Sequence, residues 1–132
     1  MIEYTINQAG GLVRVRMSGC ITSADMVRHY SRVHDDPLYD PSFNVLFHID
    51  DDVGGPIMAE LPGIGLQMEA VARLQHRTKW AVVLAPGFRR TIAEFLFLGL
   101  KLASVQMRFF DDDQQALAWV DPGHAARVPD NV

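Results

Sequence analysis

The hydrophobic pattern between residues 80 and 111 predicts the centre of an open α/β domain. An uninterrupted apolar run from Trp80 to Ala85 ends at Pro86-Gly87, and a strongly apolar helical pattern follows from Phe88 to Ala103. A further strand pattern from Gln106 to Phe110 stops at three consecutive aspartates. A strand that is apolar on both sides is covered on both faces, which is typical of a parallel sheet. We therefore expect the first of these strands to lie in the interior of the sheet.

Two alternating patterns near the start of the chain predict a β-hairpin with one buried and one solvated face. Apolar and polar residues alternate on either side of Gly10-Gly11, a pair suited to a tight turn. On the solvated face, Arg14 and Arg16 could pair across the strands with Glu3. The buried face is predicted to hold Ile2, Tyr4, Ile6, Val13, Val15 and Met17.

A first helix is expected after the hairpin. Thr22 can cap its start, Asp25 favours the positive end of its dipole, and Asp35-Asp36-Pro37 ends it. His29 and His34 are five residues apart, so they do not share a face and are not a metal pair. The apolar stripe of this helix is predicted to consist of Met26, Val27, Tyr30 and Val33.

Helix and strand patterns alternate along the rest of the chain, which favours parallel strands joined by right-handed crossovers. The fold class predicted is α/β: a single domain with a mixed, mostly parallel five-stranded sheet and about four helices. Its first strand is antiparallel to the second. The domain spans residues 1–120, and residues 121–132 form a loose C-terminal tail. The other elements are a third strand from Asn44 to Asp50, a second helix after Leu61-Pro62-Gly63 up to about Gln75, and a last helix from Gln114 to Val120.

Composition and charge narrow the possible function classes. With 132 residues, 48% of them hydrophobic, the chain suits one globular domain. Its net charge of −4 argues against nucleic acid as a partner, and Cys20 alone provides neither a disulfide framework nor a cysteine zinc site. Met1 to Ile6 lacks the pattern of a leader, and the longest apolar segment, Phe95 to Leu100, is too short for a transmembrane span. We expect a cytoplasmic protein.

Polar residues at the end of the third strand are the first candidates for chemistry. His48 and Asp50 point to the same side of this strand, where a carboxylate could orient an imidazole. No nucleophile accompanies them, so we expect no enzymatic activity and no cofactor. The run from Asp50 to Asp52 lacks the spacing of a calcium loop, which favours a solvated loop over a metal site.

The start of the long helical pattern suggests a second candidate region. Gly87 can cap the helix, and Arg89 and Arg90 fall in its first turn, where the helix dipole disfavours cations. Either a bound anion or the acids at neighbouring strand ends should offset these charges, and we favour the acids. The ligand or anion-binding candidates are therefore Asp50, Asp51, Gly87, Arg89 and Arg90.

The same helical pattern is apolar on two sides. Its core face is predicted to hold Phe88, Ile92, Phe95, Gly99 and Leu102, on a wheel of about 100° per residue. Ala93, Phe97 and Leu100 fall on roughly the opposite side. A helix that is apolar beyond one stripe is buried on more than one side. We therefore predict a homodimer in which these three residues form the interface.

The order of elements resembles the SpoIIAA-like STAS family. The residues that carry the resemblance are Phe109-Phe110-Asp111 followed by Gln115 to Val120, a Phe-Asp-x-x-x-x-Ala-x-Trp pattern. The family resemblance covers about residues 1–120 and implies a small βα superhelix, related in architecture to the CRAL-TRIO lipid-binding domains. It implies a non-enzymatic binding or regulatory module that acts through a protein partner or a small ligand. The alternative is a carrier of a small apolar or lipid-like ligand.

One departure from the family separates this chain from its phosphoswitch members. In those members a serine after the third strand is phosphorylated by a partner kinase. Here residues 50–60 contain neither serine nor threonine, so the family's phosphorylatable serine is missing. The resemblance leaves open whether Asp50 to Asp52 replace the phosphoswitch or form only a solvated loop.

Overall fold

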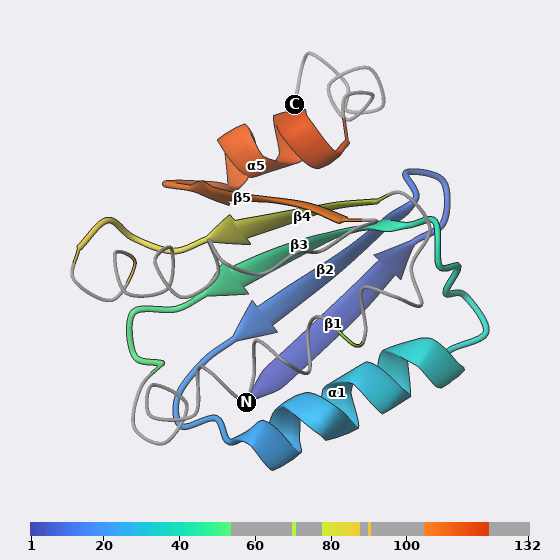
Figure 1. Ribbon diagram of the computed structural model, residues 1–132, viewed down its shortest axis with the longest axis horizontal. Coiled ribbons are helices and arrows are strands. Elements are labelled where there is room, and N and C mark those ends of the chain that lie inside the picture. Colours follow the sequence, from blue (N-terminus) through green and yellow to red (C-terminus); the bar gives the residue numbers. More distant parts are fainter. Residues whose placement is uncertain (54–69, 71–77, 88–89, 91–104, 122–132) are drawn as a thin grey trace, which may run out of the picture.

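The computed structural model describes residues 1–53, 70, 78–87, 90 and 105–121, which contain a five-stranded sheet with a helix on each face (Figure 1). The strands follow one another across the sheet in chain order, from β1 to β5. The elements are β1 Ile2–Asn7, β2 Leu12–Met17, α1 Ser23–Asp35, β3 Asn44–Ile49, β4 Thr78–Val83, β5 Val105–Phe110 and α5 Asp113–Val120.

The topology confirms the predicted sheet. Strand β1 is antiparallel to β2, and β2 through β5 are parallel to their neighbours. Strand β4 lies between β3 and β5 and is buried at all but one position, as its apolar run predicts. Its bounds differ from the expected 80–85: it begins at Thr78 and ends at Val83, and Ala85 is exposed in the following loop.

The helices are confirmed only in part. Two helices lie within the described residues, fewer than the four expected. Apart from Ala70 and Arg90, the segments 61–75 and 88–103, where the sequence predicts the other two, lie outside the described residues.

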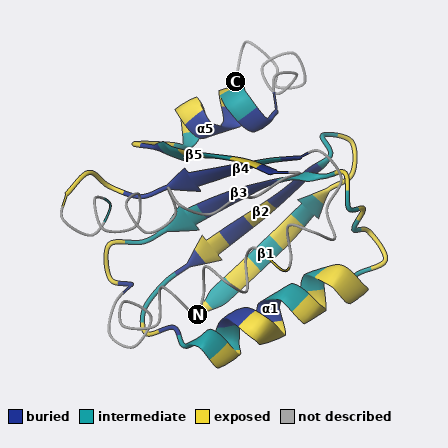
Figure 2. Ribbon diagram, in the orientation of Figure 1, coloured by how far each residue is buried: buried dark blue, intermediate teal, exposed yellow. Residues whose placement is uncertain are grey.

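The hairpin has the predicted buried and solvated faces. Its strands pair in register from Ile2 with Met17 to Asn7 with Leu12. Gly11 takes a positive φ of 60° in the turn, a conformation that glycine adopts without steric cost. The residues of β1 and β2 alternate between covered and exposed positions (Figure 2). The arginines of β2 therefore stand on an open side of the sheet.

Helix α1 begins with the predicted cap but buries a different stripe. The Thr22 side chain accepts from the Asp25 amide, and the Asp25 carboxylate accepts from the Thr22 amide, which makes a full capping box. Val27, expected in the stripe, is 50% exposed, and His29 is buried instead. The face toward the sheet is Met26, His29, Tyr30 and Val33, spaced by three or four residues, and Val27 is about 100° away from it.

The sheet has a core on each face. The α1 side buries the alternate residues of β2 to β4 that include Val15, Phe47 and Trp80, and Trp80 is only 1% exposed. The opposite side buries Leu46, Ala81 and Val83 under α5. Helix α5 is capped by Asp112, whose side chain accepts from the Gln115 amide. The second core covers parts of β3 to β5 and Leu12 at the start of β2, and it leaves Arg14 and Arg16 of β2 exposed on the same face.

Candidate functional site

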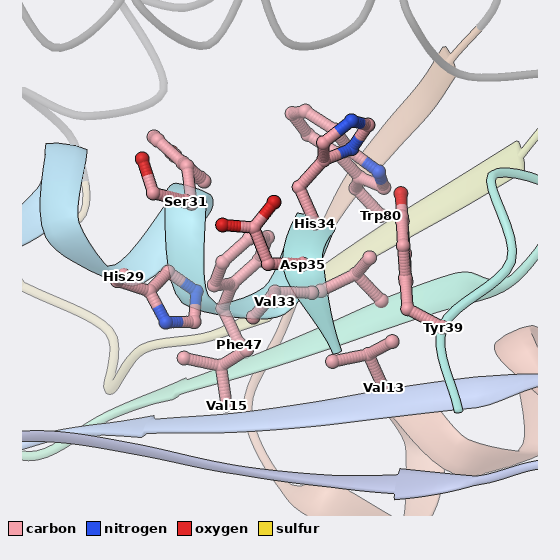
Figure 3. A pocket seen from close by; sticks show the side chains of 12 residues that line it. Val13, Val15, His29, Ser31, Val33, His34, Asp35, Tyr39, Phe47 and Trp80 are labelled. Carbon is pink, nitrogen blue, oxygen red and sulfur yellow. The ribbon is translucent and has the colours of Figure 1, made fainter. Parts of the chain in front are cut away.

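A cavity of about 260 Å³ lies between α1 and the sheet; we call it the α1 cavity (Figure 3). Its floor is made of apolar side chains from β2, β3 and β4. In Figure 3, His29 lies at one end, and Trp80 and Tyr39 lie at the other. The described lining residues are Val13, Val15, His29, Tyr30, Ser31, Val33, His34, Asp35, Tyr39, Val45, Phe47 and Trp80.

The alternation of the strands positions the floor of this cavity. Residues two apart on a strand share a face, so Val13 and Val15 point to the α1 side, as do Val45 and Phe47 on β3. Parallel pairing places these residues side by side, because Val13 pairs with Val45 and Val45 with Trp80. The result is a continuous apolar surface under one helix.

Two residues that line the cavity each carry a buried hydrogen-bond donor that has no partner within the described part of the chain. They are the hydroxyl of Tyr30 and the indole N–H of Trp80. The ring of Tyr30 is partly exposed, but its hydroxyl is buried. The hydroxyl of Thr78 is also buried and unpaired, although it does not line the cavity. An unpaired buried polar group costs about 1 to 3 kcal/mol, and each of these donor atoms is closed off from the cavity as well as from the solvent.

Burial keeps the side chains of His29 and Tyr30 uncharged at neutral pH. Burial raises the pKa of Tyr30, so its phenol stays protonated and able to donate. Burial, with a smaller contribution from the Arg32 guanidinium, lowers the pKa of His29 to about 4. His29 packs between the rings of Tyr4 and Tyr30, with centroid distances of 5.9 and 5.5 Å.

A network of ion pairs occupies the open face of β2 and β3. His48 lies between two carboxylates, with Nδ1 2.6 Å from Asp113 and Nε2 3.3 Å from Asp50. Arg16 pairs with Asp50 at 3.0 Å, and Arg14 lies 3.6 Å from Asp113. The expected proximity of His48 and Asp50 is observed. Glu3 lies opposite Arg16 in the hairpin, but the two arginines form their ion pairs with the aspartates.

This network joins α5 to the sheet rather than forming a reaction centre. His48 is 37% exposed, and both of its nitrogens face carboxylates. None of the side chains of the network is a serine, threonine or cysteine that His48 could activate. The contacts therefore suit a structural role at the start of α5.

Three of the candidates at the carboxyl ends of the strands, Asp50, Asp51 and Arg90, lie near Asp111. Asp50, Asp51 and Asp111 line one hollow of about 460 Å³. Arg90 forms an ion pair with Asp111, as predicted from the helix dipole. Gly87 lies in the exposed loop after β4 with a φ of 146°. Arg89, Ala93, Phe97 and Leu100 lie outside the described residues.

Two of the three aspartates after β3 make separate contacts within the fold. Asp50 pairs with Arg16, and its carbonyl accepts from the Val53 amide at 3.1 Å to close a turn. Asp52 accepts from the Gly19 amide at 3.0 Å. In the part of the chain that the structure describes, no group of three His, Cys, Asp or Glu side chains is arranged to hold a metal ion. These contacts favour a structural loop.

Sequence reasoning did not find the α1 cavity. The available signal was His29 and Tyr30, two polar rings next to each other on a helix that packs against apolar strands. Neither residue type indicates an unfilled space, because the size of that space depends on the distance between α1 and the sheet.

Comparisons with known proteins agree with this fold. Among the described residues, no helix has the length and apolar character needed to cross a membrane. Searches of curated proteins and of solved structures find no match. A family model described as SpoIIAA-like matches residues 12–121, from the start of β2 to the end of α5. Because this match covers most of the 132 residues and confirms the suspected resemblance, the chain belongs to the SpoIIAA-like family.

Proposed function

We propose that this protein is a non-enzymatic binding module whose ligand is a small, mainly apolar molecule held in the α1 cavity. The family suggests a regulatory or binding module, and STAS domains are generally non-catalytic. The observation that carries the proposal is the α1 cavity itself, a space of about 260 Å³ between α1 and the sheet with a floor of apolar side chains.

The size of the cavity suits a small ligand. A dry apolar cavity of about 150 Å³ accepts benzene, and pockets for drug-sized molecules begin at about 300 Å³. The α1 cavity, at about 260 Å³, lies between these limits. A compact ring or a short chain fits this volume better than a complete phospholipid.

Filling the cavity from α1 tests the proposal. Val33→Phe adds a ring on the face of α1 that lines the cavity, whereas Val27→Phe makes the same change at an exposed position of the same helix. Native mass spectrometry and solvent extraction of the purified proteins should show a bound small molecule with wild type and Val27→Phe. The Val33→Phe variant should have lost it. Equal occupancy in the two variants would place any ligand elsewhere.

The other candidate sites remain separate proposals. A homodimer through Ala93, Phe97 and Leu100 rests on the helical pattern of the sequence. A ligand or anion at Asp50, Asp51, Gly87, Arg89 and Arg90 is weakened by the ion pairs that Asp50 and Arg90 already form. A protein partner could use the surface around these residues. The α1 cavity offers the stronger case, because it is an open space with a floor of apolar side chains.

A further inference from the structure

We infer that the ligand of the α1 cavity is a small apolar amine, with its ammonium group at the rim beside the Asp35 carboxylate and its hydrocarbon body on the apolar floor. This inference rests on the proposed function and narrows its ligand to amines of small apolar molecules. It excludes small apolar acids, which are anions at neutral pH.

Asp35 places one negative charge at the rim of the cavity. It is the last residue of α1, it lines the cavity, and it is exposed, so a ligand can reach its carboxylate. In the view of Figure 3 this carboxylate lies between His29 and Tyr39, which mark the two ends of the cavity. A charged group of a ligand can therefore stay at the rim, in contact with water, while the rest of the molecule lies on the floor.

The carboxylate of Asp35 has no partner among the described residues. It accepts no hydrogen bond there and forms no ion pair, whereas most of the other described aspartates do one or the other. Those with such a partner include Asp25, Asp36, Asp40, Asp50, Asp52, Asp111, Asp112 and Asp113. Asp35 also stands at the C-terminal end of α1, where the helix dipole disfavours a negative charge. A bound cation would be attracted by both the carboxylate and the last carbonyls of the helix.

The described lining of the cavity is unsuited to an anion. It contains no lysine or arginine, and burial lowers the pKa of His29 to about 4, so this ring is neutral. A carboxylate placed here would lose its hydration without gaining a counter-charge, and Asp35 would repel it. The floor, which includes Val15 and Phe47, favours a hydrocarbon body for the ligand.

Three probes of similar size separate these requirements. 2-Phenylethylamine is a cation at neutral pH, 2-phenylethanol is neutral, and phenylacetate is an anion. Titration calorimetry at pH 7 should show the amine binding about two- to fivefold more tightly than the alcohol, which is the range of one exposed ion pair, and phenylacetate binding most weakly. An alcohol or an acid that binds at least as tightly as the amine overturns the inference. Failure of all three probes to bind instead overturns the proposed function.

Removing the charge of Asp35 tests its role directly. Asp35→Asn should lower the affinity for 2-phenylethylamine to that for 2-phenylethanol, and it should leave the affinity for the alcohol unchanged. Glu3→Gln is the matched control and should bind both probes as wild type does, because Glu3 is an exposed acid that forms no ion pair within the described residues and does not line the cavity. An Asp35→Asn variant that keeps the preference of wild type for the amine overturns the inference.

Two further measurements separate an ionic contact with the ligand from a structural role of Asp35. The preference of wild type for the amine over the alcohol should shrink when the salt concentration is raised from about 20 mM to about 500 mM, because salt screens exposed charges. Without probe, Asp35→Asn should unfold at the same or a higher temperature than wild type, because it removes a charge that the helix dipole disfavours. A preference that salt does not change, or a clear loss of stability in the variant, contradicts the inference.

Discussion

At the scale of single residues, His29 shows how burial changes the chemistry of a side chain. It is 5% exposed and packs against the rings of Tyr4 and Tyr30. The desolvated imidazole resists protonation, so its pKa falls to about 4 from an ordinary value of 6.5. Between these two pH values the unfolded chain binds more protons than the folded one. Stability must therefore fall as the pH drops through this window.

The direction in which stability changes with pH can be tested. Between pH 7 and pH 5, His29 should cost the folded state about 2 kcal/mol, and His29→Phe should remove that part of the acid sensitivity. The measurement is urea unfolding of both proteins at the two pH values. His34→Phe, the same change at an exposed position of α1, should keep the acid sensitivity of wild type. An unchanged pH dependence in His29→Phe would mean that the buried imidazole is already charged at pH 5.

The positions of single residues were predicted correctly where their spacing along one strand determines which side they face. His48 and Asp50 were expected on one side of a strand, and they lie 3.3 Å apart. Asp113, 65 residues away from His48, could not be anticipated as its second partner, because the approach of α5 to the sheet depends on packing. The buried position of His29 was missed for a related reason. Val27 is the more apolar residue, but helix geometry puts His29 on the face with Met26 and Val33.

At the scale of elements, Asn44 shows how one side chain can link the ends of several elements. Its side-chain oxygen accepts from the Lys79 amide at 2.8 Å, and its side-chain nitrogen donates to the Val120 carbonyl at 2.7 Å. One residue thus connects the beginnings of β3 and β4 with the end of α5. Thr78 and Lys79 look like turn residues in the sequence, so the early start of β4 was not predicted. Cross-strand pairing, which a local pattern does not contain, extends the strand to include them.

The ion pair after β4 and β5 gives an element-scale prediction. The Arg90 side chain is 18% exposed and contacts Asp111, which follows β5. Arg90→Glu should place two carboxylates together and lower the free energy of unfolding by about 1 kcal/mol at low salt, and less at high salt. Urea unfolding at two salt concentrations measures this loss. Adding Asp111→Arg should restore most of it. Equal stability of Arg90→Glu and wild type at low salt would contradict a stabilising pair.

At the scale of the whole molecule, the predicted homodimer is still to be tested. Phe97 and Leu100 fall opposite the core stripe of the helical pattern, and leaving them in water would forgo roughly 1.5 to 3 kcal/mol each. Two-fold dimers are the commonest assembly and use the same patch on both subunits. Sedimentation should show a dimer for wild type and a monomer for the Phe97→Glu, Leu100→Glu double variant.

Two results would reject this interface. Wild type that is monomeric at tens of micromolar, roughly the dissociation constant of a moderate complex, has no stable dimer. A double variant that dimerises as well as wild type places the interface elsewhere. Burial of the helix under residues 121–132 is the main competing explanation, and deletion of that segment from the double variant would separate the two.

The sheet as a whole was the most predictable feature, because periodicity identifies strands and a buried run identifies an interior one. The cavity was the least predictable. Its volume is the space that remains between α1 and three strands, and no residue taken alone encodes it. The unpaired state of Tyr30 and Trp80 is also invisible in the sequence, since it depends on what their donor atoms face.

The strand order, in which each strand pairs with the next one along the chain, has a consequence for how the protein is made. No strand has to insert between two that are already paired, so each new strand can add to an existing edge as it leaves the ribosome. Domains form from the N-terminus during synthesis, and pairing between sequence neighbours keeps loop-closure costs low. Until β5 arrives, however, β4 would be an exposed apolar edge. The interval after β4 has emerged from the ribosome and before β5 has emerged should therefore be the stage most prone to aggregation.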